Sequence, residues 1–381
     1  MRQYKILFIV NSANFFITHR MHLALEAKKE GYDVHIAAPI DKKSKKYLLD
    51  FGFKLHEIYL EQYSLNIFKE IKCICSLNIL IANIKPELLH LITIKPIFYG
   101  SIFSSLLKVP CVIISFTGLG HLHVALDFKT RIIRMIIYFF FKFIFNRSKL
   151  CVIFQNSDDQ FFFVKNKIIK KNQSCLIKGS GVDLKKFRFN QKEPLGIITV
   201  MMASRMLWSK GLSDFIEVAK KLKARDLNVR FVLVGKPELN DLYGANLKTL
   251  IKLDKSGIVE WWGFKENMDK VIQQSHIFCL PTKYGEGVPK VLIEAAACGK
   301  PLVGSNTSGC REIIFDGLNG FLSEPGNIDS LSSSLERLIL SRKLRLNMGL
   351  KSRIIAESEF SISEVTNKTI TQYKKLLKLL P

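Results

Sequence analysis

The sequence predicts an α/β protein with two doubly wound domains, each a parallel sheet with helices on both faces. Its 381 residues are more than one hydrophobic core usually serves. Short apolar runs, typical of buried parallel strands, alternate with helical segments. This alternation restarts after a polar stretch over 186–196. We therefore expect domains over 1–188 and 193–362, with an amphipathic helix over about 363–381 that packs back on one of them, assigned here to the first.

Apolar runs bounded by polar residues, Gly or Pro predict the strands of the first domain. These runs are 5–11, 33–39, 88–93, 110–116 and 150–155. A helix is expected over 18–32, with Thr18 as its N-cap and Gly31 at its end.

The second domain repeats the order of strand and helix. Its expected strands are 196–204, 229–235, 258–263, 276–282 and 301–306. Its expected helices are 211–226, 266–275 and 288–299.

The segment 131–149 combines many Ile, Met and Phe residues with one polar stripe at helical spacing. The stripe contains Arg131, Arg134, Tyr138, Lys142 and Lys149. One interpretation is a core helix with a single solvated stripe. The other is a helix in a membrane interface, with its apolar side toward the lipid and its basic residues near lipid phosphates.

The charge of the chain is strongly basic and uneven. It has 57 Lys and Arg against 33 Asp and Glu, and residues 1–190 hold 29 of the former and 13 of the latter. The first half is therefore expected to face an anionic partner such as nucleic acid, phospholipid or a phosphorylated substrate.

The cysteines and the lengths of the apolar runs narrow the class of protein that the sequence can encode. The eight cysteines are scattered without a metal-binding spacing, which favours reduced core cysteines in a cytoplasmic protein. The N-terminal apolar run is short and predicts a strand rather than a signal peptide. No window reaches the roughly 18 apolar residues that a membrane span needs.

Two cations follow the first strand of the second domain, at the edge where open α/β sheets bind ligands. Arg205 and Lys210 bracket the start of the next helix. Forked donors, a point charge and free helix N–H groups together suit a diphosphate. Two solvated surface cations would give the same spacing, so both interpretations stay open.

Two acids lie around a later helix start. Glu286 precedes Pro289, which suits a first helical turn, and Glu294 lies inside the helix. A carboxylate accepts two hydroxyl hydrogen bonds, so paired acids suit the vicinal diols of ribose and hexose. The alternative is one acid stabilising a helix dipole and one exposed helix acid.

These motifs together resemble the retaining glycosyltransferases of the GT-B fold, family four. Motifs of the second half occur in the family's order and spacing: 179-GSGVD, 203-ASRMLWSKG, 231-FVLVG, 261-WWGF, 286-EGVPKVLIE, 295-AAACGKPLVGSNTSGCREII and 316-DGLNGFL. The first half is similar more loosely, through 18-THR, 115-SFTGLG and 152-VIFQNSDD. In detail the chain resembles bacterial transferases that build O-antigen or other undecaprenyl-diphosphate-linked glycans, some of which use UDP-N-acetylgalactosamine.

The resemblance implies two Rossmann-like domains facing a cleft, with the acceptor on the first and the nucleotide-sugar on the second. Arg205 and Lys210 would bind the donor diphosphate, Glu294 the ribose hydroxyls and Glu286 the donor sugar. The other donor-site residues would be Gly235, Gly263, Phe264, Gly287, Val288, Pro289, Thr117 and Gly118. On the acceptor side they would be His19 and Arg20.

One position departs from the family pattern. Many relatives carry a His directly after the strand equivalent to 112–116, where this chain has Thr117. His121 and His123 follow, and His121 is either a catalytic candidate or an ordinary loop histidine. No Asp-x-Asp motif occurs near a nucleotide loop, so we expect no essential metal or other cofactor, with Arg205 and Lys210 offsetting the diphosphate charge.

The implied reaction moves N-acetylgalactosamine, or another hexose or N-acetylhexosamine, from a UDP-sugar to an undecaprenyl-diphosphate-linked saccharide with retained anomeric configuration. The enzyme would lie on the inner face of the bacterial cytoplasmic membrane and contact its anionic surface. A non-hydrolysing sugar-nucleotide epimerase of similar build stays an alternative. A nucleic-acid-binding role is less favoured because no such motif occurs. An NAD-linked enzyme is disfavoured because 11-NSANFF replaces GxGxxG.

Overall fold

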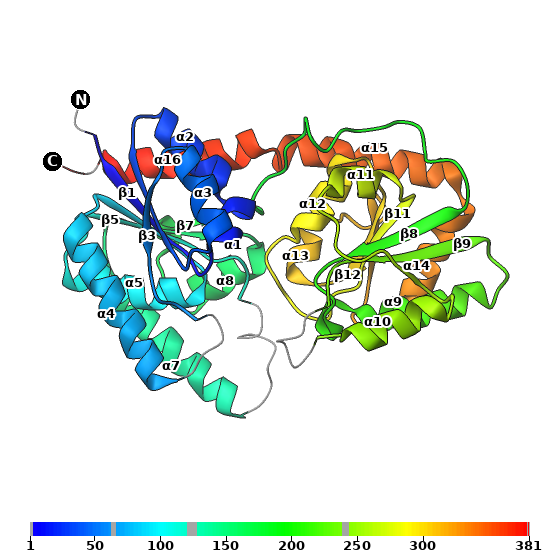
Figure 1. Cartoon of the computed structure of the whole chain (residues 1–381), viewed down its shortest axis with the longest axis horizontal. Coiled ribbons are helices and arrows are strands. Elements are labelled where there is room, and N and C mark those ends of the chain that lie inside the picture. Colours follow the sequence, from blue (N-terminus) through cyan, green and yellow to red (C-terminus); the bar gives the residue numbers. More distant parts are fainter. Residues whose placement is uncertain (1–2, 62–65, 120–127, 238–243, 379, 381) are drawn as a thin grey trace. The chain divides into compact units, whose positions relative to one another are not determined.

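The computed structural model describes residues 3–61, 66–119, 128–237, 244–378 and 380 (Figure 1). The chain divides into two compact units. The first unit contains Met1–Ser180 and Ser363–Pro381, and the second contains Gly181–Ile362. Each unit is built on one parallel sheet, so the α/β class predicted from the sequence is confirmed.

The first unit has a seven-stranded sheet in the order β3-β2-β1-β4-β5-β6-β7. The strands are β1 Lys5–Ile9, β2 Asp33–Ala38, β3 Lys54–Glu57, β4 Leu88–Ile92, β5 Cys111–Ser115, β6 Leu150–Phe154 and β7 Ser174–Leu176. The central strands β1, β4, β5 and β6 are buried on both faces, which explains their continuous aliphatic runs. The sequence did not predict β3 and β7, which are short and lie at the two edges.

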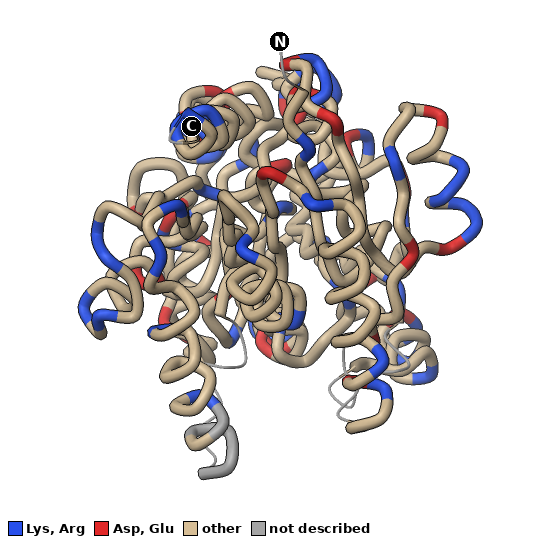
Figure 2. Tube along the Cα trace, turned by 90° about the vertical axis from the view of Figure 1, so that its left-hand side faces the viewer, with Lys and Arg blue, Asp and Glu red and all other residues tan. Residues whose placement is uncertain are grey.

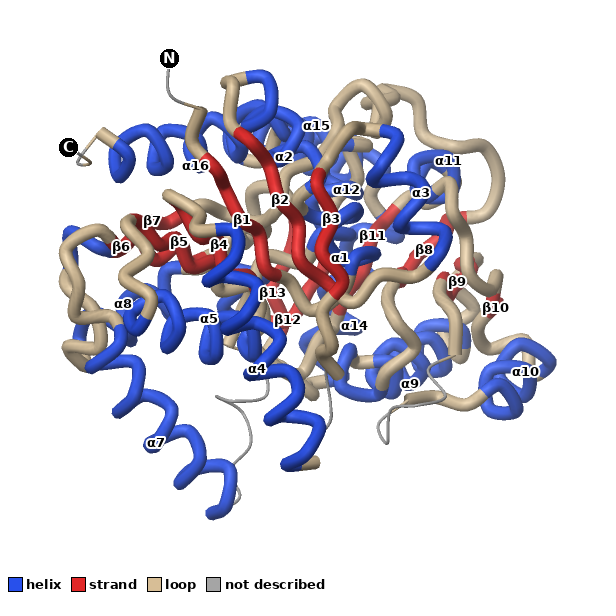
Figure 3. Tube along the Cα trace, turned by 60° about the vertical axis from the view of Figure 1, so that its left-hand side comes forward, coloured by secondary structure: helices blue, strands red, loops and turns tan. Residues whose placement is uncertain are grey.

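Helices cover both faces of this sheet (Figure 3). They are α1 Ala13–His19, α2 Met21–Lys29, α3 Lys42–Asp50, α4 Ile67–Ile84, α5 Ile94–Leu106, α7 Phe128–Ile144, α8 Ser157–Lys165 and α16 Ile362–Leu377, with a 3-10 turn η1 at Lys171–Gln173. One face packs against α1, α2 and α16, and the other against α4, α5 and α7.

The C-terminal helix α16 belongs to the first unit and is held there by a buried polar network. Tyr373 is fully buried, and its hydroxyl lies 2.6 Å from His90 Nδ1 on β4. The other ring nitrogen of His90 lies 2.7 Å from the hydroxyl of Ser115 at the end of β5. The tail therefore completes one face of the first sheet.

Two helix boundaries differ from the sequence-based expectation. The helix predicted from Thr18 begins instead at Ala13, because Ser12, three residues after the end of β1, accepts the Phe15 N–H and acts as the N-cap. Thr18 lies within α1. The helix is interrupted at Arg20, which separates α1 from α2. The helix predicted over 131–149 ends at Ile144, so Lys149 does not share its stripe. The side chain of Arg131 lies outside the described residues.

The second unit has a six-stranded sheet in the order β10-β9-β8-β11-β12-β13. The strands are β8 Ile198–Ala203, β9 Val229–Val234, β10 Glu260–Trp261, β11 Ile277–Leu280, β12 Leu302–Ser305 and β13 Gly320–Ser323. The helices are α9 Leu212–Lys223, α10 Leu247–Lys255, α11 Met268–Gln273, α12 Lys290–Ala297, α13 Ser308–Arg311, α14 Ile328–Leu340 and α15 Arg342–Glu359, with a 3-10 turn η2 at Trp208–Lys210.

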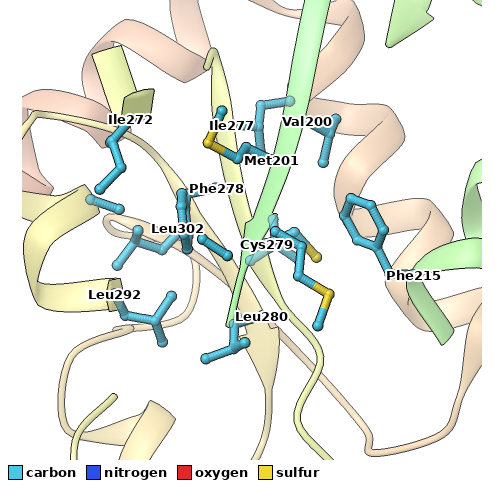
Figure 4. Close-up of a cluster of buried hydrophobic side chains, with 14 of the residues drawn as sticks. Val200, Met201, Phe215, Ile272, Ile277, Phe278, Cys279, Leu280, Leu292 and Leu302 are labelled. Atoms are coloured by element: carbon cyan, nitrogen blue, oxygen red, sulfur yellow. The ribbon is translucent and has the colours of Figure 1, made fainter. Parts of the chain in front are cut away.

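The core of the second unit lies on both sides of its sheet. Figure 4 shows Phe215 of α9 on one side of the strands and Leu292 of α12 on the other, with Met201 and Phe278 between them. All four side chains are buried. Helices α9 and α12 are thereby held rigidly, and both begin at the carboxyl edge of the sheet, which positions the loops described next.

Within the described part of the chain, no helix combines the length and the apolar character needed to cross a membrane.

Candidate functional site

The loop between β8 and α9 carries both predicted phosphate-binding cations. It passes close to the loop after β11, where a Cβ on Gly211 would lie 1.8 Å from the Pro281 carbonyl oxygen. Gly211 also has a φ of +84°, which favours glycine. The Lys283 N–H donates to the Ser209 carbonyl at 3.0 Å. The carboxyl ends of the neighbouring strands β8 and β11 are therefore tied together by backbone contacts.

Lys210 and Glu286 meet where these loops join. Lys210 Nζ donates to Glu286 Oε2 at 2.5 Å, and the two side chains are only 13% and 18% exposed. The Lys210 ammonium also lies 5.1 Å from the ring centre of Tyr284. Burial lowers the pKa of Lys210, but Glu286 and Tyr284 together outweigh this effect, so the pKa is raised. The site therefore keeps a buried positive charge beside a carboxylate.

Arg205 lies on the same loop as Lys210. It follows Ala203, the last residue of β8, by two positions, and its side chain is exposed. The structure thus brings Arg205, Lys210 and Glu286 to adjoining loops at one edge of the sheet, as expected for ligand-binding groups in an open α/β fold.

The backbone around Glu286 is held by the start of α13. A Cβ on Gly309 would lie 2.1 Å from the Gly287 carbonyl oxygen, so only glycine permits this approach. Val288 is buried and Pro289 is the N-cap of α12. Glu286 is consequently fixed just before the N-terminus of α12, where the helix dipole favours negative charge.

Glu294 lies within α12 and is largely enclosed. Burial raises its pKa, against the effect of the positive charges of Lys290 and Lys186. Lys290 Nζ lies 3.8 Å from Glu294 Oε1. Sequence reasoning missed Lys290, although a Lys and a Glu four positions apart on a helix are a recognisable signal.

The predicted glycines of the donor site connect three loops. Gly235 has a φ of +153°, and a Cβ there would lie 2.0 Å from the Ser204 carbonyl oxygen. Its N–H donates to the Gly263 carbonyl at 2.9 Å. The loops after β8, β9 and β10 are therefore packed together, and the exposed Phe264 follows at their edge. The close neighbour of Gly235 is thus Ser204, while an approach to a nucleotide stays a prediction.

Two groups missed by sequence reasoning support this arrangement. Lys283 Nζ contacts Asp214 Oδ1 of α9 at 2.7 Å. Tyr284 provides the ring beside Lys210. Neither forms a local sequence pattern with its partner, because the two loops are distant along the chain.

In the first unit, Thr117 and Gly118 follow β5. Gly118 has a φ of +106°, and the next residue, Leu119, donates its N–H to Asp159 Oδ2 at 3.3 Å. This contact ties the loop to the first turn of α8. His121 and His123 lie outside the described residues.

The two predicted acceptor-side residues differ in exposure. His19 is the last residue of α1, with its Nδ1 3.1 Å from the Ser180 hydroxyl. Arg20 is buried, and burial lowers its pKa to about 10 against the effect of Tyr373. Arg20 therefore faces the interior network around α16, and contact with an acceptor stays a prediction for both residues.

No group of three or more His, Cys, Asp and Glu side chains in the described parts of the chain is arranged to hold a metal ion.

Sequence families cover most of the chain. The family "Glycosyl transferase 4-like" matches residues 5–156, and "Glycosyl transferases group 1" matches residues 183–354, which include Arg205, Lys210, Glu286 and Glu294. The chain is a group 1 glycosyltransferase. This confirms both the family resemblance and the enzyme class predicted from the sequence motifs.

Two curated relatives of this glycosyltransferase act on lipid-linked glycans. The N,N'-diacetylbacillosaminyl-diphospho-undecaprenol alpha-1,3-N-acetylgalactosaminyltransferase of Campylobacter jejuni is 28% identical over 94% of this chain and 95% of its own length. The UDP-Gal:alpha-D-GlcNAc-diphosphoundecaprenol alpha-1,3-galactosyltransferase of Escherichia coli is 26% identical over 74% of each chain.

A solved structure shows the same fold. Anabaena Alr3699/HepE, crystallised in complex with UDP-glucose, superposes with a TM-score of 0.76 at 17% identity, covering 99% of this chain and 100% of that one. The glycosyltransferase therefore has the GT-B fold that the sequence predicted.

Proposed function

We propose that this glycosyltransferase transfers a hexose or N-acetylhexosamine, with N-acetylgalactosamine as the first candidate, from its UDP form to an undecaprenyl-diphosphate-linked saccharide. The contact between Lys210 and Glu286 carries the proposal. A nucleotide-sugar joins a diphosphate to a polyhydroxylated ring through one bond, so a cation and a carboxylate in contact suit that junction. The two curated relatives support the lipid-linked acceptor and the choice of sugar.

The proposed roles follow from charge and position. Lys210, with Arg205 on the same loop, offsets the negative charge that grows on the departing UDP. Glu286 orients the donor sugar through its hydroxyls, and Glu294 binds the ribose. The bond between the anomeric carbon and the phosphate oxygen breaks, a bond to the acceptor oxygen forms on the same face, and the acceptor proton passes to the leaving diphosphate. No side chain forms a covalent intermediate, and we expect transfer to persist in EDTA.

The acceptor is assigned to the first unit. Its sequence carries most of the positive excess of the chain, which suits a diphosphate lipid at an anionic surface. Along the described trace, Lys and Arg are spread over many elements and interrupted by acids (Figure 2). This distribution favours a small phosphorylated ligand over a long nucleic-acid track. The product would enter O-antigen or a related surface polysaccharide, made at the inner face of the cytoplasmic membrane.

A panel of donors tests this proposal. UDP-N-acetylgalactosamine, UDP-galactose, UDP-N-acetylglucosamine and GDP-mannose are each incubated with the enzyme and a polyprenyl-diphosphate-linked saccharide. We expect transfer from a UDP-sugar, with the product's anomeric configuration retained by NMR. Transfer from GDP-mannose alone would contradict the nucleotide assignment. Conversion of a UDP-sugar to its isomer without any acceptor would identify the epimerase instead.

A further inference from the structure

We propose that an apolar surface formed by α7 and the first turns of α4 inserts into the headgroup region of an anionic lipid bilayer. This surface would be the membrane contact of the proposed function. The proposal rests on the proposed function in one respect: a lipid-linked acceptor is the reason why the enzyme would need to contact a membrane.

Helix α7 exposes large apolar side chains along most of its length. The most exposed lie four residues apart, with Met135 at 67%, Phe139 at 60% and Phe143 at 64%. A second exposed row runs beside them and contains Ile132, Ile136 and Phe140. A core helix with one solvated polar stripe would bury these side chains, so the first interpretation of this segment is wrong.

The opposite side of α7 is already used by the fold. Phe141 is buried and contacts Phe116 of the loop after β5 and Phe98 of α5. Tyr138 packs on Phe163 of α8. A surface helix normally has one apolar face, directed at the core. Helix α7 has a second apolar face, and contiguous exposed apolar surface marks a site of contact with a partner or a membrane.

Helix α4 presents a second group of exposed apolar side chains. Its first two turns expose Ile67, Phe68 and Ile71, with Phe68 at 80%. Helix α5 packs against both α4 and α7 and so lies between them. Figure 3 shows α4 and α7 projecting on the same side of the first sheet. Each follows a strand, β3 or β5, so both begin at the carboxyl edge of the sheet, where ligands bind in this class of fold.

Charge decides which partner this surface takes. The sequence of Phe128–Ile144 contains no Asp or Glu, and Lys142 is exposed on it. On α4, Lys69 and Lys72 are exposed beside the apolar side chains, whereas the acid of the first turn, Glu70, binds Lys95 of α5. Lys69 also pairs with the partly exposed Glu61 at 2.8 Å. Among the lysines named here, Lys72 on α4 and Lys142 on α7 are therefore the exposed ones without a carboxylate contact in the described part of the chain. Exposed aromatic side chains with lysines beside them are typical of helices that lie in membrane interfaces.

The same lysines make it less favourable for this surface to bind another protein. Lysine is depleted in the cores of protein–protein interfaces. A second copy of this chain would also place Lys142 and Lys72 of each copy near like charges. An anionic bilayer instead offers phosphates to the lysines and acyl chains to the aromatic rings.

Flotation of the full-length enzyme with lipid vesicles tests the proposal. Vesicles of phosphatidylcholine with phosphatidylglycerol are compared with phosphatidylcholine alone. The test variant combines Phe139→Asn and Phe143→Asn. The matched control combines Leu340→Asn and Ile354→Asn, two exposed apolar residues of the second unit. We expect the unaltered enzyme and the control to float with the anionic vesicles, less so at high salt. The affinity of the test variant for the anionic vesicles should be at least about tenfold lower than that of the unaltered enzyme.

A tryptophan reporter gives a second readout. Phe139→Trp should show a blue shift of its emission when anionic vesicles are added, because the ring enters an apolar environment. Leu340→Trp, on the second unit, should show none. An equal response from both reporters would overturn the proposal.

The outcomes separate this surface from the proposed function. Flotation of the test variant equal to that of the unaltered enzyme, or an equal loss in the control, would overturn the membrane contact. So would self-association that the test variant abolishes while no form floats, which would identify a second copy as the partner. Transfer to a water-soluble short-chain acceptor should be unchanged in the test variant, which also shows that it folds. Failure of transfer with every donor would contradict the proposed function and leave the flotation result standing.

Discussion

Lys210 and Glu286 stand 76 positions apart in the sequence, yet their charged atoms lie 2.5 Å apart in the second unit. The contact joins the loop after β8 to the loop before α12. Because both side chains are largely buried, the contact between them contributes to keeping both charges in the folded protein. The pair is therefore the natural place to test the site.

Replacing Lys210 with alanine should depress catalysis strongly. The variant removes the charge proposed to offset the leaving UDP, so we expect kcat to fall by roughly a hundredfold to a thousandfold. It also removes the ammonium that lies 2.5 Å from the buried Glu286 carboxylate, which should lower the free energy of unfolding. Initial rates at saturating donor and a urea unfolding curve measure the two effects separately.

Two further variants are needed to interpret the result for Lys210→Ala. Lys248→Ala, an exposed residue of α10, should leave rate and stability unchanged. Combining Lys210→Ala with Glu286→Gln should restore stability, because the buried carboxylate is neutralised, without restoring the rate. Wild-type rates in both Lys210→Ala and Arg205→Ala would show that the phosphate assignment is wrong.

The pH dependence of nucleotide binding should report the ionisation of Glu294. Burial raises the pKa of this carboxyl, and the ionised form is the one that accepts two ribose hydrogen bonds. UDP affinity should therefore be full above the raised pKa and fall as the pH decreases through it. Glu294→Gln should weaken binding by roughly tenfold to a hundredfold at neutral pH and remove this acid limb. Calorimetric titration of UDP across the acidic range measures both.

The control for this prediction is Glu217→Gln on the exposed surface of α9. It should bind UDP as the unaltered enzyme does at every pH. An acid limb that survives unchanged in Glu294→Gln would assign the titration to another group.

Glycine substitutions should separate steric need from backbone conformation. Gly235→Ala places a Cβ 2.0 Å from the Ser204 carbonyl oxygen at a positive φ, so we expect a loss of about 3 kcal/mol or more in the free energy of unfolding. Gly263→Ala has a positive φ but no heavy atom within 4 Å of its Cβ, so it should cost only about 1–2 kcal/mol. Urea denaturation compares the two, and equal losses would contradict the packing described here.

The buried strands were predictable because parallel sheets covered on both faces need continuous aliphatic runs, as in β4 and β5. The edge strand β3 was not, since Lys54–Glu57 is polar and only its pairing with β2 makes it a strand. The start of α1 was misplaced because Ser12 and Thr18 are both good caps, and only the end of β1 decides between them.

Some features of the candidate site were likewise predicted from the sequence, and others were not. The family resemblance assigned Lys210 and Glu286 to one donor site, and the structure brings them together because β8 and β11 are adjacent parallel strands whose carboxyl ends meet at one edge of the sheet. The contact of Tyr284 with Lys210 and that of Lys283 with Asp214 depend on how two distant loops pack, which no local pattern records. The exposure of the apolar face of α7 was also undecided by sequence, because periodicity cannot tell which side of an apolar helix meets the core.

The stability of the first unit should fall as the pH drops below the ordinary pKa of histidine, about 6.5. Burial and the nearby charge of Arg20 hold the pKa of His90 well below that value, so His90 is neutral when folded and takes up a proton on unfolding. Its contribution is therefore complete above about pH 6.5 and is lost progressively as the pH falls.

His90→Gln should cost about 1–3 kcal/mol at neutral pH, because the hydroxyls of Tyr373 and Ser115 lose their partner. Urea denaturation at several pH values should show this difference shrinking toward acid, whereas His22→Gln, on the exposed side of α2, should show a difference that stays near zero. A difference for His90→Gln that does not change with pH would mean that His90 titrates alike in the folded and unfolded enzyme, which would contradict the buried neutral imidazole. A difference that grows toward acid would mean that the folded imidazole is protonated and that the network holding α16 is built around a charge.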